Sequence, residues 1–296
     1  MCVLVALVCF FGGTSLAFAK DVLVTGAGGR TGILVVGALL EKGYGVKAVV
    51  HSKKSKDELL KKYSKLSEER VFIADIQNKS SLTAAFAGCA AVIVATSAVP
   101  KLKAWSLIPF LLKKLIGQKG KLRFCWKGGP DGKPEQVDWE GQKNQFDCAS
   151  EAGVQHVVLV GTMTGTQKDS FLNSIGEGDG DQIVMWKRKA EVYLIELSKK
   201  TKMKYTIIHA GGLSDDLAGK ALVKVGVDDK LREEKNFRIP RADIAKACVE
   251  ALDCELAKDR SFDMSSVEGG EPFTDLEKLL KELGDKTCDY SINPPP

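Results

Sequence analysis

The sequence is poor in histidine and has no closely spaced cysteine pair. Its 296 residues include three histidines, and none of the eight cysteines belongs to a C-x-x-C pair. Structural zinc sites draw on such pairs, so we predict no bound metal. A chain long enough to bury its own core also has no need of a disulfide framework. We therefore expect reduced and mostly buried thiols.

A strong excess of one charge is also missing. Lys and Arg number 43 against 38 Asp and Glu, which leaves a formal net charge of +5. That excess fits an anionic small ligand as well as nucleic acid. The lysine-rich stretch 53–65 alternates with leucines, as expected of a helix with one solvated face, so we predict no nucleic-acid partner. The rest of the composition is that of an ordinary globular protein, and oligomer formation stays open.

Charged side chains are absent from residues 1–19. Val3–Phe11 is a continuous apolar run, and small residues at Ser15 and Ala17 follow with signal-peptidase spacing. We predict a leader or targeting segment over 1–19, with a retained anchor or a mis-started N-terminus as alternatives. The string SLAFA at 15–19 resembles the junction of signal peptides for algal secondary plastids. This resemblance implies a plastid location, with the cytoplasm as the alternative and no membrane association after leader removal.

From Lys20 onward, short apolar runs alternate with helical patterns. The predicted strands are 21–25, 46–50, 71–74, 91–95, 156–160, 205–208 and 261–264. The predicted helices are 31–42, 56–65, 80–86, 135–152, 182–199, 241–251 and 274–283. Strands that are apolar throughout are typical of a parallel sheet covered on both faces. The pattern predicts an α/β fold with a doubly wound parallel sheet.

We expect a single domain over residues 20–286. Glycine-rich stretches at 100–134 and 164–181 interrupt the alternation, and both follow predicted strands. They are predicted to be long loops that cover a ligand site, with plain surface insertions as the alternative. Residues 287–296, which end in three prolines, are predicted to form a loose tail.

The clearest motif is a glycine-rich turn between the first strand and the first helix. Residues 26–32 read GAGGRTG, with the spacing G-x-x-G-x-x-G. The first glycine would turn the chain, the second would let the backbone approach a pyrophosphate, and the third would let the helix pack on the strand. Amides at the helix start would hold the phosphates. The predicted cofactor-binding residues here are Gly26, Gly28, Gly29, Arg30, Thr31 and Gly32. The alternative is a glycine-rich turn without a ligand.

The end of the second strand bears on the choice of cofactor. An NAD-binding protein usually places Asp or Glu there for the ribose 2′-hydroxyl. This chain has His51, Ser52 and Lys53 instead, and Arg30 lies in the glycine loop. Cations and a hydroxyl suit a 2′-phosphate, so we predict NADP in preference to NAD. The alternative for Lys53 is an exposed charge at a helix start.

Two further strand ends are predicted to contact the cofactor. Asp75 and Ile76 follow the third strand and would bracket the adenine. Thr96, Ser97 and Ala98 follow the fourth and would run beside the ribose and pyrophosphate. All these positions lie at the edge of the sheet where open α/β folds bind ligands.

Several blocks in order carry a family resemblance. They include TGAGGRTG (25–32), ATSAVPK (95–101), PEQVDWEGQKNQFD (134–147) and WKRKAEVYL (186–194). Over residues 21 to about 285 the chain resembles the atypical short-chain dehydrogenase/reductase family, in its NmrA-like and plant NAD(P)-binding branch. The resemblance implies one Rossmann domain with a small C-terminal lobe and a bound NADP or NAD.

The catalytic Tyr-x-x-x-Lys of short-chain dehydrogenases is missing. None of the five tyrosines has a lysine four residues later. The resemblance places the family's lysine at Lys189, as a ligand of the nicotinamide ribose, and its tyrosine at Met185, which cannot donate a proton. It places the family's serine at Thr162. Lys187 is expected to be an ordinary solvated helix lysine.

Together these features leave two predicted functions. The first is an NADP-dependent reductase of a small conjugated acceptor, which can take hydride first and draw its proton from water. Aromatic residues could form a flat slot for it, although core or loop packing is the alternative; they are Trp105, Phe110, Trp126, Trp139 and Trp186. His209, at the end of a predicted strand, could titrate or hydrogen-bond near the site. The second function is a non-catalytic NADP-binding redox sensor or assembly protein.

Overall fold

The computed structural model describes residues 21–118, 122–176, 180–219, 222–233, 237–267 and 273–295. Seven parallel strands form the main part of the sheet, in the order β3-β2-β1-β4-β7-β8-β12. Their bounds are β1 Asp21–Thr25, β2 Gly45–Val50, β3 Val71–Ile73, β4 Cys89–Val94, β7 His156–Thr162, β8 Lys204–Ala210 and β12 Arg260–Val267. This order confirms the doubly wound Rossmann fold.

Three further strands extend the sheet beyond β8 and β12. They are β9 (Gly212–Ser214), β10 (Leu222–Gly226) and β11 (Arg238–Pro240). Both β10 and β11 run antiparallel to β12, and β9 pairs parallel with β11. With β12 and the last two helices they form the small C-terminal lobe. The sequence pattern does not predict these three strands.

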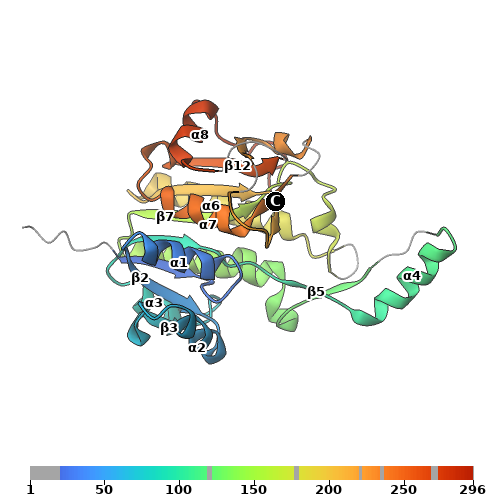
Figure 1. Ribbon diagram of the computed structural model, residues 1–296, viewed down its shortest axis with the longest axis horizontal. Coiled ribbons are helices and arrows are strands. Elements are labelled where there is room, and N and C mark those ends of the chain that lie inside the picture. Colours follow the sequence, from blue (N-terminus) through green and yellow to red (C-terminus); the bar gives the residue numbers. More distant parts are fainter. Residues whose placement is uncertain are drawn as a thin grey trace, which may run out of the picture.

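Helices cover both faces of the sheet (Figure 1). On one face α1 (Gly32–Glu41), α2 (Lys53–Lys62), α7 (Arg241–Glu250) and α8 (Leu276–Leu283) bury Val36, Leu59, Val249 and Leu280 in one apolar core. On the other face α3 (Lys79–Phe86), α5 (Gly141–Glu151) and α6 (Ile183–Lys200) bury Phe86, Phe146 and Leu194 in a second. Burial of both faces accounts for strands without polar alternation.

Residues 100–118 and 122–126 form an arm, whereas the sequence predicts a long covering loop over 100–134. β5 (Pro100–Leu102) pairs antiparallel with β6 (Phe124–Trp126), and α4 (Leu107–Leu115) lies between them. Figure 1 shows the arm carrying α4 away from the sheet. The second predicted loop contains a short 3-10 helix, Phe171–Ser174, within its described part. No helix among the described residues is long and apolar enough to cross a bilayer.

The C-terminal segment is bound to the domain through residue 293, so the prediction of a loose tail is wrong for this part. Cys288 is buried. Arg188 of α6 donates hydrogen bonds to the carbonyl oxygens of Asp289, Ile292 and Asn293. A buried guanidinium needs such acceptors. Because the segment supplies them from its backbone, no apolar pattern in the sequence indicates that it is bound. The predicted leader, residues 1–19, lies outside the described residues.

Candidate nucleotide-binding and active site

The glycine turn adopts a conformation that side chains would block. Gly26 has φ of +69°, and a Cβ there would lie 2.7 Å from the carbonyl oxygen of Ala95 at the end of β4. A Cβ on Gly32 would lie 2.1 Å from the carbonyl oxygen of Gly26. The amide of Gly29 donates to that same carbonyl over 2.8 Å. The start of α1 is therefore pressed against the carboxyl end of β1, a cradle that fits a pyrophosphate.

The turn faces the amino end of α2. A Cβ on Gly28 would lie 2.8 Å from the Cβ of Ser55, in the first turn of that helix. Ser52 caps α2, because its hydroxyl accepts the amide hydrogen of Ser55 over 3.2 Å. The two helix starts thus form one corner beyond β2. His51 and Lys53 are exposed there, and Lys53 pairs with Asp57 on the same helix over 3.1 Å.

Arg30 follows Gly29 in the glycine turn, and its side chain reaches toward the segment after β9. Its guanidinium lies 3.3 Å from the carboxylate of Asp215, and both side chains are about two-thirds exposed. Exposed ion pairs contribute little to stability, so such a contact leaves the cation available to a ligand. Asp215 also accepts a hydrogen bond of 2.6 Å from Arg241 at the start of α7.

Asp75 and Ile76 lie where β3 ends, as predicted. The Asp75 carboxylate is exposed and accepts the amide hydrogen of Gln77 over 3.0 Å, which closes its own turn. Ile76 packs against Gly141 at the start of α5, and its carbonyl accepts a hydrogen bond of 3.0 Å from Asn144. Their contact with adenine stays a prediction.

The loop after β4 is held by buried polar side chains from the segment 134–147. Asp138 accepts the amide hydrogen of Ala98 over 3.0 Å. The Gln142 amide donates to the Thr96 carbonyl over 3.3 Å, and the Gln145 amide to the Thr96 hydroxyl over 3.1 Å. A π-helical turn over Glu135–Glu140 leads into α5 and carries Asp138. Ser97 lies between these two anchored residues. The family motif at 134–147 thus shapes the loop predicted to line the cofactor.

The two lysines of the W-K-R-K string have different surroundings. Lys187 is only 7% exposed and pairs with Asp138 over 2.6 Å. Lys189 is half-buried, with its ammonium 4.9 Å from the ring centre of Trp139 and 5.1 Å from that of Trp186. The expectation that Lys187 is a solvated lysine is therefore wrong. The pair with Asp138 brings Lys187 to the loop after β4, and no hydrogen bond among the described residues does this for Lys189.

Thr162 stands at the end of β7 and is half-buried. Side chains alternate along a strand, so Thr162 points to the opposite face from Gly161. Among the described residues, no hydrogen bond joins Thr162 to Lys187 or Lys189. Four positions before Lys187 stands Ile183, and four before Lys189 stands Met185. Whichever lysine is taken as the family's lysine, the residue at the tyrosine position cannot donate a proton.

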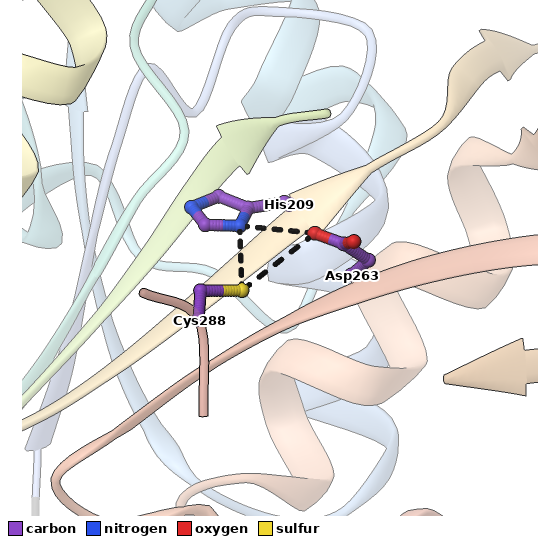
Figure 2. Close-up of side chains that lie close together, drawn as sticks. All are labelled: His209, Asp263 and Cys288. Carbon is purple, nitrogen blue, oxygen red and sulfur yellow. Dashed lines mark hydrogen bonds and ion pairs between the residues drawn. The ribbon is translucent and has the colours of Figure 1, made fainter. Parts of the chain in front are cut away.

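His209 belongs to a buried polar cluster next to this edge of the sheet (Figure 2). Its Nε2 lies 3.1 Å from Glu191 Oε2, and its Nδ1 lies 3.2 Å from Asp263 Oδ1 and 3.5 Å from Cys288 Sγ. The Tyr290 hydroxyl is 3.3 Å from both Nε2 and Glu191 Oε2. We name these five residues the His209 cluster.

The His209 cluster determines charge and packing around it. Burial disfavours the imidazolium, but the carboxylate of Glu191, followed by Tyr290 and the hydrogen bonds to Asp263 and Cys288, raises the pKa of His209 well above its usual value. The cluster also explains Gly161, where a Cβ would lie 2.7 Å from Glu191 Oε1 and 2.8 Å from His209 Cδ2. Sequence reasoning identified His209 but not its partners, which come from separate elements.

The predicted aromatic slot does not form as a unit. Trp105, 59% exposed, lies on the outward arm with Phe110, under the guanidinium of Arg123. Trp126 is buried and donates to Asp181 over 2.7 Å, while Trp139 packs edge-on against Tyr193. A cavity of about 660 Å³ lies at the opposite end of the sheet, near Lys204 and Tyr205 at the start of β8. It has no part in the nucleotide site.

A Rossmann sheet whose first strand leads through a glycine-rich turn into the first helix defines a dinucleotide-binding protein. Comparison with known proteins agrees, since residues 26–255 match the family model for NAD(P)H-binding. The chain belongs to this NAD(P)H-binding family, among the atypical short-chain dehydrogenase/reductases of the NmrA-like type.

Two relatives cover most of the chain. An uncharacterized chloroplastic protein of Arabidopsis thaliana is 42% identical over 269 residues, which is 90% of this chain and 76% of that protein. Sanguinarine reductase of Eschscholzia californica is 39% identical over 275 residues, which is 88% of this chain and 95% of that protein. Among solved structures, a yeast methylglyoxal/isovaleraldehyde reductase complexed with NADPH aligns at a TM-score of 0.56 and 15% identity, over 83% of this chain and 78% of that one. This last likeness concerns the fold.

Proposed function

We propose that the protein is an NADP-dependent reductase of a small conjugated acceptor. The observation that carries the choice of cofactor is the corner between the glycine turn and α2. His51 and Lys53 stand there where an NAD-binding protein has a carboxylate, and Arg30 lies in the glycine turn itself. Two cations and two helix starts suit the extra phosphate of NADP.

The residues present fit a dinucleotide. A Cβ at Gly26 or Gly32 would collide with neighbouring backbone, so these glycines let α1 begin close to the end of β1. Amides at the start of such a helix suit a pyrophosphate. Asp138 orients both Lys187 and the backbone of Ala98, so Lys187 is the proposed ligand of the nicotinamide ribose. Lys189 remains the alternative. The cofactor, when bound, supplies a hydride.

The chemistry proposed for this chain follows from what stands at the catalytic positions. A positioned general acid contributes roughly 10²–10⁴-fold to the rate, and Ile183 and Met185 cannot provide it. Thr162 supplies a hydroxyl that can hydrogen-bond an acceptor but has no activating partner among the described residues. Acceptors that take hydride first and draw a proton from water remain accessible. The name of the relative sanguinarine reductase supports a reductase of this kind.

The second candidate is a redox sensor or assembly protein without turnover. The missing proton donor favours it, because NADP binding needs no acid. Under either function we propose a plastid location, which rests on the leader-like N-terminus and on the chloroplastic Arabidopsis relative.

One experiment separates the two functions. Oxidation of NADPH is measured over a panel of quinones, flavins and tetrapyrroles, with binding of NADPH and NADH followed in parallel by calorimetry. The reductase predicts saturable turnover that Lys187→Met weakens and Lys189→Met leaves largely intact. Tight NADPH binding with no turnover across the panel supports the sensor. Failure to bind either nicotinamide cofactor would overturn both.

A further inference from the structure

A buried triangle of metal-type ligands lies within the His209 cluster. Figure 2 shows His209, Asp263 and Cys288 pointing toward one another from β8, β12 and the C-terminal segment. The nitrogen Nδ1 and the oxygen Oδ1 are 3.2 Å apart, and Sγ lies 3.5 Å from the nitrogen and 3.8 Å from the oxygen. Around tetrahedral Zn²⁺ with ordinary bond lengths, such donor pairs are about 3.4–3.6 Å apart. We propose that these three side chains bind a divalent transition metal, best suited to zinc.

The surroundings of the imidazole match those of metal-bound histidines. The other ring nitrogen, Nε2, lies 3.1 Å from Glu191 Oε2. Histidine ligands usually donate their second N–H to a carboxylate, which fixes the ring and leaves the first nitrogen's lone pair toward the ion. Glu191 is itself 3% exposed and within 3.3 Å of the Tyr290 hydroxyl. The orienting carboxylate is therefore already in position.

A fourth coordination position is open. A cavity of about 10 Å³ borders the triangle, lined also by Thr166, Arg188 and Asp229. That volume is roughly the room that one water molecule needs. Asp229 is held by the amides of Thr164 and Thr166, and its own amide donates to the second oxygen of Asp263 over 2.7 Å. Three protein ligands and one small ligand complete a tetrahedron.

Charge is conserved when the ion enters. The ion brings two positive charges and displaces two protons to solvent, one from Cys288 Sγ and one from His209 Nδ1. No electron moves. A thiolate with an imidazole favours zinc over magnesium or calcium, which prefer oxygen ligands. The sequence predicts no metal because its zinc patterns need ligands close in sequence, and these are separated by 54 and 25 residues.

The test uses the full chain stripped with a chelator and titrated with Zn²⁺ alone, and then with Co²⁺ as a spectroscopic substitute. We expect one ion per chain, tetrahedral cobalt bands and thiolate-to-cobalt charge-transfer absorption. Cys288→Ser should abolish that absorption. Glu191→Gln should weaken affinity roughly 10–100-fold through loss of the orienting carboxylate. Cys254→Ser, another buried cysteine outside the cluster, is the matched control.

Far-ultraviolet circular dichroism checks that each variant folds. If Cys288→Ser does not fold, Asp263→Asn serves as the second variant of a metal ligand. Absence of stoichiometric Zn²⁺ binding by the folded wild-type chain would overturn the site. So would cobalt binding without thiolate absorption, or an affinity that Cys288→Ser and Asp263→Asn leave unchanged. NADPH binding is measured separately, so the metal proposal can fail while the proposed function stands.

The outward arm carries a second and independent inference. Six leucine and isoleucine side chains of α4 and its end are 41–83% exposed; they are Leu107, Ile108, Leu111, Leu112, Leu115 and Ile116. Successive helix residues advance by about 100°, so these positions cover one half of the helix. Exposed apolar stripes of this kind mark binding surfaces. Figure 1 shows the helix held away from the sheet.

Charge indicates what the stripe binds. No Asp or Glu occurs between Asp75 and Asp131, whereas eight Lys and Arg residues fall between positions 101 and 127. Lys101 and Lys114 on the arm are exposed, as is Trp105. An apolar helix face with cations and an indole beside it suits the surface of an anionic bilayer. We infer that α4 rests on an anionic lipid surface, contrary to the expectation of no membrane association.

Flotation with phosphatidylcholine vesicles, with and without phosphatidylglycerol, tests this inference. We expect the protein to bind the anionic vesicles and to lose binding at high salt or with Leu111→Glu. Leu217→Glu, on a leucine 67% exposed elsewhere, should bind normally. No binding to anionic vesicles would overturn the inference. Concentration-dependent dimers abolished by Leu111→Glu would also overturn it, because they assign the face to a second copy of the chain.

Discussion

Lys187 and Asp138 form an ion pair of 2.6 Å that is almost completely removed from solvent, with side chains 9% and 0% exposed. The pair joins α6 to the turn before α5, and through the amide of Ala98 it also fixes the loop after β4. Removing one partner from a buried pair leaves an uncompensated charge and costs about 3–5 kcal/mol. We therefore predict that Asp138→Asn loses stability of this order and binds NADPH more weakly. Urea unfolding and calorimetry measure the two effects.

The matched control for this pair is Lys189→Met. Lys189 lies over the indoles of Trp139 and Trp186, contacts worth about 0.5–1 kcal/mol at such a site. It should change stability slightly and NADPH affinity little. An equal loss of NADPH affinity in Lys187→Met and Lys189→Met would contradict the assignment of the ribose to Lys187 alone.

Cofactor choice should depend on Arg30 in the glycine turn and on Lys53 at the start of α2. Arg30→Ala and Lys53→Ala each remove a donor proposed for the 2′-phosphate, and a hydrogen bond to a charged group is worth about 1.5–3 kcal/mol. We expect NADPH affinity to fall about tenfold or more, with NADH affinity unchanged. Lys54→Ala, which removes the next lysine on α2, is the control. Equal losses for NADPH and NADH would show that these cations do not contact the 2′-phosphate.

Acid stability should depend on His156. Burial, helped by the charge of Lys258, lowers the pKa of His156 to about 4 from 6.5. The unfolded chain therefore binds a proton between pH 6.5 and 4 while the folded chain does not, so stability falls as pH falls through this window. The shift corresponds to about 3 kcal/mol. Urea unfolding at pH 7 and pH 4.5 should show a smaller acid loss in His156→Gln than in the wild-type chain. An equal loss of stability in His156→Gln and in the wild-type chain would show that His156 does not cause the acid sensitivity.

The regular part of the fold could be predicted from the sequence. Parallel strands buried on both faces leave continuous apolar runs, and β1 and β2 were located within one residue of their observed bounds. Strands β9 and β11 read GLS and RIP, and neither contains a continuous apolar run of the kind that predicts β3. The arm was missed for another reason. Its helix is apolar but leaves six leucine and isoleucine side chains exposed, and the glycines and prolines around it suggest a loop.

The candidate site could be predicted where it follows a local motif. The glycine turn is recognisable because its glycines lie close together in sequence, between a strand and a helix. Lys187 and Lys189 differ by two positions, and only the location of Asp138 decides which one is buried. The His209 cluster assembles from β8, α6, β12 and the C-terminal segment. No spacing reveals such an assembly before the sheet order is known.

The C-terminal segment provides a last prediction, because its contacts contradict a loose tail. Removal of residues 288–296 would leave the Arg188 guanidinium without three carbonyl acceptors and expose His209. Each lost hydrogen bond to a charged group is worth about 1.5–3 kcal/mol, so the truncated chain should lose several kcal/mol of stability. Removal of residues 294–296 keeps all these contacts and should have no effect. Urea unfolding of the two truncations gives the comparison, and equal stability would show that the segment contributes nothing to the folded domain.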